Sequence, residues 1–215
     1  TVSIGAINVS PPTCNSGTWT APTANVSSLV DGAVLVVASQ TDTAGNVGSG
    51  SRTTSKDVSS PTVTVTTAPP INFGNQSSYS GVTGTCSESG LPVSVTIGAI
   101  AVAPVPTCSG GAWTAAAINA TSLPVGVVTV TASQTDAAGN IGSGTRDTVK
   151  DVTLPVVTVT TAPPINNANQ ASYTGVTGTC SENGLPVSVL IGNVNALPSP
   201  NCASNAWTAA SVNVA

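Results

Sequence analysis

The amino-acid sequence predicts an all-β protein made of tandem immunoglobulin-like β-sandwich domains in an extended array. Three observations carry this prediction. Charged residues are 6% of the 215 residues, against about 25% in an average globular protein, while hydrophobic residues are 40%. Thr and Val alternate in short runs that Gly and Pro interrupt, as in strands separated by turns. The same landmarks return at a fixed spacing, as in an array of domains.

The charge and the residue types exclude several classes of function. The formal net charge is −4, and the only basic residues are Arg52, Lys56, Arg146 and Lys150, so a nucleic-acid partner is not expected. Histidine is absent, which removes the commonest acid–base group and metal ligand. No apolar run is long enough for a membrane span. The N-terminus lacks a signal-peptide pattern, so we expect any targeting signal to lie outside this stretch.

The repeat has a period of 94 residues, given by 108 − 14 and 202 − 108 for Cys14, Cys108 and Cys202. Cys86 and Cys180 share this period, and so do the three tryptophans, Trp19, Trp113 and Trp207. Roughly two-thirds of positions are identical when 58–121 is aligned with 152–215, too many for chance.

The repeat divides the chain into three parts at the segments KDVSSPTV and KDVTLPVV, which have the polar and proline character of linkers. Residues 1–57 are the C-terminal part of one domain, 58–151 a complete domain, and 152–215 the N-terminal part of another. The end parts share 57 + 64 − 94 = 27 repeat positions. We therefore expect a window of a longer array. A subunit that completes its end domains with a neighbour's strands is the less favoured alternative.

Strands are predicted in order through the complete repeat. TVTVTT at 62–67 and VSVTI at 93–97 alternate apolar and polar residues, as does GVVTVTASQT at 126–135. The other predicted strands lie at 78–86, near 100–106, at 113–118 and at roughly 141–150. Seven short strands in one repeat, with frequent turn signals and no helical period, indicate an immunoglobulin-like sandwich.

The cysteines predict two disulfides, Cys86–Cys108 and Cys180–Cys202. Cys86 ends a strand, and the chain then runs out along 93–97 and returns, so Cys108 should reach the same end of the sandwich. A small core with few aromatic residues benefits from such a bond, which also implies an oxidising compartment. The partner of Cys14 would lie 22 residues upstream, before Thr1. Two buried free thiols per repeat are the alternative, and zinc is not expected.

The segments VTGTCSESGLPVSVTIG, CSGGAWTA, LPVGVVTVTASQTDAAGN and KDVTLP resemble the bacterial immunoglobulin-like (Big-type) domains repeated in large surface adhesins and biofilm-associated proteins. The resemblance covers the whole chain as parts of three repeats. It implies an extracellular location at the bacterial cell surface and a role as stalk, spacer or adhesive tip. A shared fold does not choose among these roles.

The octapeptide SQTDAAGN at 133–140, with SQTDTAGN at 39–46, fits two kinds of structure. A hairpin turn would use Asp136 as an acceptor for backbone N–H groups and Gly139 for a positive φ. A Ca²⁺ site at a domain junction would take oxygens from Asp136 and Asn140, with Asp151 or Glu182 added. Calcium needs six to eight oxygens, usually with several carboxylates, and this repeat has few. The sequence favours the turn and assigns no metal or cofactor.

The remaining candidate residues indicate structure rather than chemistry. Trp113 is expected in the core, because a sugar-binding platform needs several exposed aromatic rings. Glu88 and Glu182 belong to different repeats and cannot form a catalytic pair. Lys56 and Lys150, candidates for isopeptide bonds, are expected beside the linkers rather than in strands. Without histidine there is no Ser-His-Asp triad, so an enzyme is not expected.

Three functions remain open. The first is a spacer whose partners are neighbouring repeats of the same chain. The second is a building block of a fibre or sheath of identical chains, since few charges repel neighbouring copies. The third is a module that binds glycan or protein through the variable segment 100–112.

Overall fold

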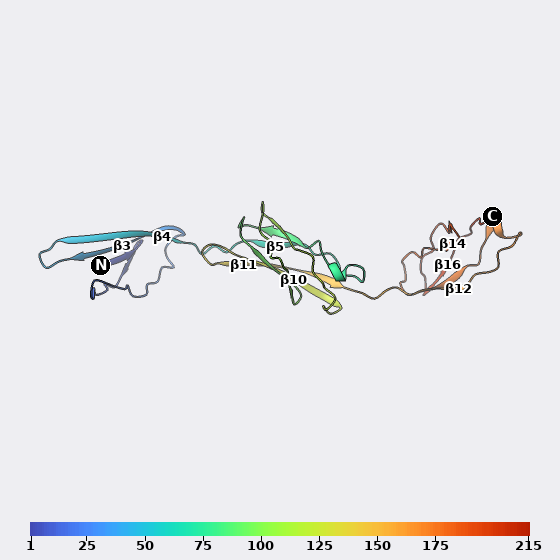
Figure 1. The fold of residues 1–215 in the computed structure, drawn as a ribbon, viewed down its shortest axis with the longest axis horizontal. Helices are drawn as coiled ribbons and strands as arrows, with labels where there is room; N and C mark the ends of the chain where they lie inside the picture. Colours follow the sequence, from blue (N-terminus) through green and yellow to red (C-terminus); the bar gives the residue numbers. More distant parts are fainter. The chain divides into compact units, whose positions relative to one another are not determined.

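The structure is a computed structural model that describes residues 1–215, and it divides into two compact units, Thr1–Asp151 and Val152–Ala215 (Figure 1). Each unit is built from antiparallel strands. Two short 3₁₀ helices, η1 (Gln76–Ser78) and η2 (Gln170–Ser172), are the only helical segments. No helix has the length and apolar character that crossing a membrane requires.

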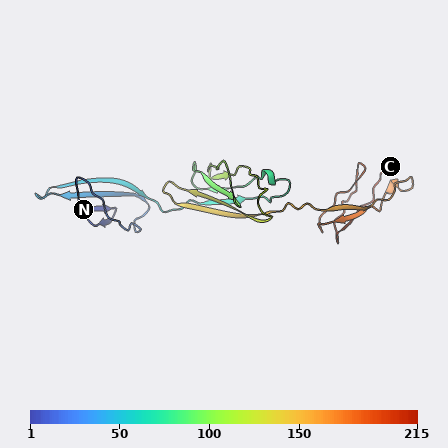
Figure 2. The ribbon, with the colours of Figure 1, turned by 60° about the horizontal axis from the view of Figure 1, so that its bottom comes forward.

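The complete repeat in the first unit is a sandwich of two sheets. One sheet has the order β5-β6-β9 and the other β11-β10-β7-β8. The strands are β5 (Val63–Thr67), β6 (Thr83–Cys86), β7 (Val93–Ile97), β8 (Ile100–Ala101), β9 (Ala112–Thr114), β10 (Gly126–Thr135) and β11 (Ile141–Lys150). Strands one, two and five of the repeat thus face strands three, four, six and seven, an immunoglobulin-like arrangement. Figure 2 shows the β10–β11 hairpin, yellow to orange, along one side of this sandwich.

The first unit also contains one sheet with the order β2-β1-β3-β4. Its strands are β1 (Val2–Ile4), β2 (Ile7–Val9), β3 (Gly32–Thr41) and β4 (Val47–Lys56). Strands β3 and β4 pair from Gly32↔Lys56 to Thr41↔Val47, the register that β10 and β11 keep one repeat later from Gly126↔Lys150 to Thr135↔Ile141. This sheet therefore repeats the four-stranded sheet of the complete sandwich.

The second unit contains the three-stranded sheet β12-β13-β16 and the hairpin β14-β15. Its strands are β12 (Val157–Thr161), β13 (Thr177–Cys180), β14 (Leu190–Ile191), β15 (Val194–Asn195) and β16 (Ala206–Thr208). Their pairing repeats that of β5, β6 and β9, including the same register shift within the first strand.

The predicted all-β fold class is confirmed. Buried residues alternate with more exposed ones along β7 and β10, as expected. Strands β7 and β10 have the predicted bounds, but 78–86 and 113–118 were predicted too long. Only β6 and β9 are continuous strands there, and beyond them Tyr79 and Ile118 meet in an isolated bridge. Small and turn-forming residues, among them Gly81, interrupt the ladder between the two regions.

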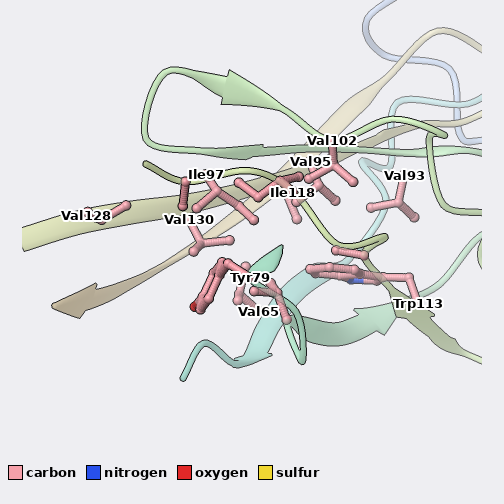
Figure 3. Close-up of a cluster of buried hydrophobic side chains, with 14 of the residues drawn as sticks. Val65, Tyr79, Val93, Val95, Ile97, Val102, Trp113, Ile118, Val128 and Val130 are labelled. Carbon is pink, nitrogen blue, oxygen red and sulfur yellow. The ribbon is translucent and has the colours of Figure 1, made fainter. Parts of the chain in front are cut away.

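The core of the complete sandwich lies between its two sheets (Figure 3). Valines and isoleucines of β7 and β10 meet residues of β5 and the rings of Tyr79 and Trp113. Phe73, the third aromatic residue of the repeat, is exposed and adds nothing to this core. Two aromatic rings therefore occupy a core otherwise made of small aliphatic side chains.

Trp113 packs directly over Gly84 of the neighbouring strand. Its Nε1 donates to the carbonyl oxygens of Thr64 (3.1 Å) and Thr85 (3.2 Å). A Cβ at Gly84 would lie 1.9 Å from the Thr64 oxygen and 2.4 Å from the indole. Glycine is required there because the ring and a strand backbone fill the space of a side chain.

We predict that Gly84→Ala destabilises the complete repeat by about 2 kcal/mol, because overpacking forces the indole or β5 to move. Gly74→Ala is the matched control, since its Cβ would meet only the tip of the Asn72 side chain, at 3.4 Å. Hydrogen exchange of the β6 and β7 amides measures the effect in the whole chain. Equal protection in the two variants would contradict this account.

Candidate functional site

The recurring octapeptide forms a closed hairpin turn at the end of β10. Asp136 Oδ1 accepts the backbone N–H groups of Ala138 (2.9 Å) and Asn140 (2.8 Å), and its Oδ2 accepts Asn140 Nδ2 (2.8 Å). Gly139 has the positive φ, +94°, while Asn140 does not. The hydrogen bond from the Asn140 side chain lowers the pKa of Asp136, and the backbone N–H groups add to this effect.

The same turn recurs one repeat earlier. Asp42 accepts from Ala44 N (2.9 Å), Asn46 N (2.8 Å) and Asn46 Nδ2 (2.9 Å), and the Asn46 side chain lowers its pKa. In both turns the aspartate oxygens accept hydrogen bonds from their own turn, and no second carboxylate takes part. The structure holds no group of three or more His, Cys, Asp or Glu residues placed to bind a metal ion.

Three other acidic residues, of which only Glu182 was proposed as a calcium ligand, lie in different surroundings. Glu88 Oε1 accepts from Ser87 Oγ at 3.0 Å. Glu182 accepts from Ser181 in the corresponding turn of the second unit, at 3.1 Å. Asp147, in the middle of β11, accepts from Thr129 Oγ1 at 2.6 Å. None of these contacts brings a second carboxylate to Asp136.

Gln134 explains the first half of the octapeptide, a role that the sequence did not reveal. Its side chain is buried and joins β10 to the turn at Glu88: Nε2 donates to the Glu88 carbonyl oxygen (2.8 Å), and Oε1 accepts from the Glu88 backbone N–H (3.2 Å). The SQTD segment therefore closes its own hairpin with Asp136 and holds the Glu88 turn with Gln134. The sequence signal for this role was that the whole octapeptide recurs, including the residues before the turn.

The cysteines lie as the pairing requires. Cys86 ends β6 and is joined to Cys108, and Cys180 ends β13 and is joined to Cys202, with a Cα–Cα distance of 5.9 Å in both. Backbone bonds hold the same end of the repeat, from Cys108 N to Leu91 O (2.9 Å) and from Cys86 N to Gly111 O (3.0 Å). Cys14 is an exposed free thiol.

Lys150 is a second feature that the sequence did not reveal, and the prediction that it lies outside a strand was wrong. It is the last residue of β11 and is 2% exposed. Its Nζ donates to the carbonyl oxygens of Ala120 (2.9 Å), Thr121 (2.9 Å) and Leu123 (2.7 Å). The ammonium group uses its three protons on one loop, so it clamps the end of β11 to the segment that leads into β10.

Lys56 makes the equivalent clamp one repeat earlier, and it too lies inside a strand, as the last residue of β4. Its Nζ donates to the carbonyl oxygens of Leu29 and Ser27, and it lies 3.8 Å from Asp31 Oδ1. The position equivalent to Asp31 in the complete repeat is Val125. The carbonyl acceptors are therefore the shared part of the clamp. The acceptors of both lysines are main-chain oxygens and, for Lys56, the Asp31 carboxylate, not asparagine side chains.

Two of the three aromatic residues of the complete repeat, Trp113 and Tyr79, lie inside it. Trp113 is 2% exposed and offers no surface to a sugar ring. Tyr79 is buried, which raises its pKa, and its hydroxyl donates to the Pro69 oxygen at 2.6 Å. Thr148 Oγ1 donates to the same oxygen at 2.7 Å, which joins β11 to the segment after β5. The repeated residues thus hold the sandwich together.

Comparison with known proteins gives no family. No family profile matches the chain, and no curated protein matches it. Among solved structures, it is similar to a tetra-tandem repeat in the extending region of a large adhesion protein. The identity is 22% and the TM-score 0.39, covering 100% of this chain and 58% of that one.

Two further similar structures are bacterial adhesins. One, described as Ca²⁺-stabilized, helps an Antarctic bacterium reach out and bind ice. It is 21% identical with a TM-score of 0.46, covering 99% of this chain and 56% of that one. The other, from a study of host cell surface retention, is a 1.5-MDa ice-binding adhesin. It is 20% identical with a TM-score of 0.41, and the match covers 99% of this chain and 74% of that one. This chain thus spans little more than half of the first two structures.

We predict that replacing both Cys86 and Cys108 with serine lowers the free energy of unfolding of the complete repeat by about 3 kcal/mol, because the unfolded loop is no longer closed. Cys14→Ser is the matched control and should change nothing, since Cys14 has no disulfide partner. Hydrogen exchange of the β7 amides measures both variants. Non-reducing peptide mass spectrometry that found Cys86 and Cys108 free would contradict the pairing.

Lys150→Met should destabilise the hairpin of β10 and β11 by about 2 kcal/mol. The methionine keeps the apolar stem but leaves the three loop carbonyls without their donor. Arg146→Met, at an exposed position of the same strand, is the control. Amide exchange across residues 126–150 reports the difference, and a Lys150→Met hairpin as protected as the control would show that the clamp contributes nothing.

The Asp136 turn should respond to acid below pH 3.8, the ordinary pKa of the group. Because the folded pKa is depressed, the carboxylate stabilises the turn fully above its unfolded pKa, and this contribution is lost as pH falls through the folded pKa. Asn140→Ala should raise the titration midpoint of Asp136, followed by its carboxyl ¹³C resonance. Asn46→Ala should move the midpoint of Asp42 and leave Asp136 unchanged. An unmoved Asp136 midpoint in Asn140→Ala would contradict this assignment.

Proposed function

We propose that this chain is a repeat region of a large bacterial surface adhesin, acting outside the cell as a non-enzymatic spacer whose partners are neighbouring repeats of the same chain. One observation carries the proposal. Residues that recur at the 94-residue period make the same hydrogen bonds within their repeats. A spacer needs copies of a stable domain, whereas a binding site is needed only once.

The recurring bonds can be followed from one repeat to the next. Trp207 Nε1 donates to Thr158 O and Thr179 O, both at 3.2 Å, as Trp113 does to Thr64 and Thr85. Tyr173 donates to Pro163 O as Tyr79 does to Pro69 O. Segment 100–112 differs most from its equivalent, and most of its positions are exposed. Disulfides in the repeats support an extracellular place.

The spacer role is tested in the surface protein that carries this chain, by varying the number of repeats. Adhesion should fall when repeats are removed and return when an equal length of unrelated, rigid domains replaces them, since only reach is required. The control exchanges one repeat for another of the same array and should have no effect. Adhesion that unrelated domains fail to restore, or direct binding of the purified chain to host glycans, would overturn the proposal.

We also propose that the repeats fold without calcium. The oxygens of Asp136 and Asp42 are engaged by their own turns, and neither faces another carboxylate. Adding Ca²⁺ or a chelator should therefore leave the melting temperature of the chain unchanged. A rise in melting temperature with Ca²⁺ that Asp136→Asn abolishes would overturn this expectation and place a calcium site at the turn.

A further inference from the structure

The linker that leads into the complete repeat is short and is fixed at both of its ends, within the first compact unit. Lys56 closes β4, and its Nζ is bound to the loop carbonyls described above. Pro61 is buried, and its carbonyl oxygen lies against β11, since a Cβ at Gly142 would come within 1.7 Å of that oxygen. Only residues 57–60 span the distance between these two anchors.

Asp31 of the preceding repeat holds this linker from one side. Its Oδ2 accepts the backbone N–H of Val58 (3.2 Å) and the hydroxyl of Ser59 (3.3 Å), while its Oδ1 lies 3.8 Å from Lys56 Nζ. The Asp57 carboxylate closes a turn in the linker itself, because its Oδ1 accepts the Ser59 N–H at 3.0 Å. The first three linker residues are therefore all hydrogen-bonded.

Asn140, the last residue of the octapeptide, holds the linker from the other side. Its Nδ2 donates to Asp136 Oδ2 within its own turn (2.8 Å) and also to the Asp57 carbonyl oxygen (3.2 Å). A side-chain amide has two N–H donors, and Asn140 uses both of them in these bonds. Ala138 of the same turn lines a small cleft together with Lys56 and Asp57. The octapeptide therefore contacts the linker before its repeat as well as closing its own hairpin.

The lysine clamp does not account for Asp31. The equivalent residue of the complete repeat is Val125, which has no acceptor atom, and there Lys150 bonds three loop carbonyls. The clamp is thus made without a carboxylate one repeat later. What Asp31 adds is the pair of bonds from its second oxygen to the linker.

These bonds bear on how freely two repeats can move. Domains that share little surface move relative to one another by default, and a linker allows this motion through rotation of its backbone. Each bond to the linker is partly exposed and is weak by itself. All of them act on the same four residues, however, so the linker bends only when several bonds break together.

We infer that Asp31 and the Asn140 turn latch the linker between them, so that residues 1–57 and the complete repeat move as one rigid body without a metal ion. The inference names a contact between neighbouring repeats. It rests on the proposed spacer function for its consequence, because stiff junctions lengthen the reach of an array. A repeat with an acidic residue at this position offers the latch to the linker that follows it, and a repeat with valine there does not.

Asp31→Val tests the latch in the whole chain. The change removes both bonds to the linker and installs the residue that the complete repeat has at this position, so the fold should be kept. Val30→Ala is the matched control, because Val30 is the neighbouring side chain and is 84% exposed. Amide exchange in β3 checks that the strand is intact in both variants.

Asn140→Ala tests the other side of the latch, because it removes the bond to the Asp57 carbonyl oxygen. It also opens the hairpin turn, so its control is Asn46→Ala, which opens the same turn one repeat earlier.

Residual dipolar couplings of the backbone amides, measured with a chelator present, report the motion between the two repeats. The original chain and both controls should fit one alignment tensor across β3, β4, β10 and β11, whereas Asp31→Val and Asn140→Ala should each require two. The Val58 amide should also exchange about tenfold faster in Asp31→Val, because it loses its acceptor.

An original chain that requires two tensors overturns the inference. An Asp31→Val or Asn140→Ala chain that still fits one tensor does the same, as does a Val58 amide that exchanges no faster in Asp31→Val. None of these readouts depends on adhesion. Failure of the latch is therefore distinguishable from failure of the spacer function, which the repeat-number experiment measures separately.

Discussion

The indole of Trp113, lying across Gly84 with its N–H between two strand carbonyls, is the interaction on which the repeat depends. It ties β9 to β6 and to β5 from within the core, where Thr64 O and Thr85 O accept the same proton. The fit is close because a Cβ at Gly84 would overlap both the ring and the backbone. Cys86, two residues beyond Gly84, then bonds β6 to the opposite loop. Because the core holds only two aromatic rings, close contacts of this kind order it more than the amount of apolar side chain it buries.

The sequence predicted what depends on local pattern and missed what depends on loops meeting in space. Alternation of Val and Thr fixed β7 and β10, because side chains on a strand alternate between its two faces. The cysteines could be paired because the path between them was a simple hairpin. Lys150 and Gln134 were missed because their partners are backbone groups 27 to 46 residues away, which have no signature in the sequence. Their recurrence in both repeats was the one available signal.

Comparison of equivalent residues separates strand formation from burial. Strands β4 and β11 have the same length and register against their neighbours, although only β11 lies under a second sheet. Strands β12 and β5 likewise have the same sequence and different exposure. Pairing along a hairpin is therefore set locally, whereas burial requires the partner sheet. Gly48 and Gly50 of β4 are equivalent to Gly142 and Gly144 of β11, which lie against the backbone of Pro61 and Val63 in the complete repeat.

Residue-resolved hydrogen exchange of dilute chain tests most directly whether the covering sheet, rather than strand pairing alone, stabilises these hairpins. The account predicts that the amides of β10 and β11 exchange orders of magnitude more slowly than those of β3 and β4, although the two hairpins share one register. Equal protection of the two hairpins would contradict it, because pairing alone would then suffice and the contacts at Gly142, Gly144 and Trp113 would contribute little.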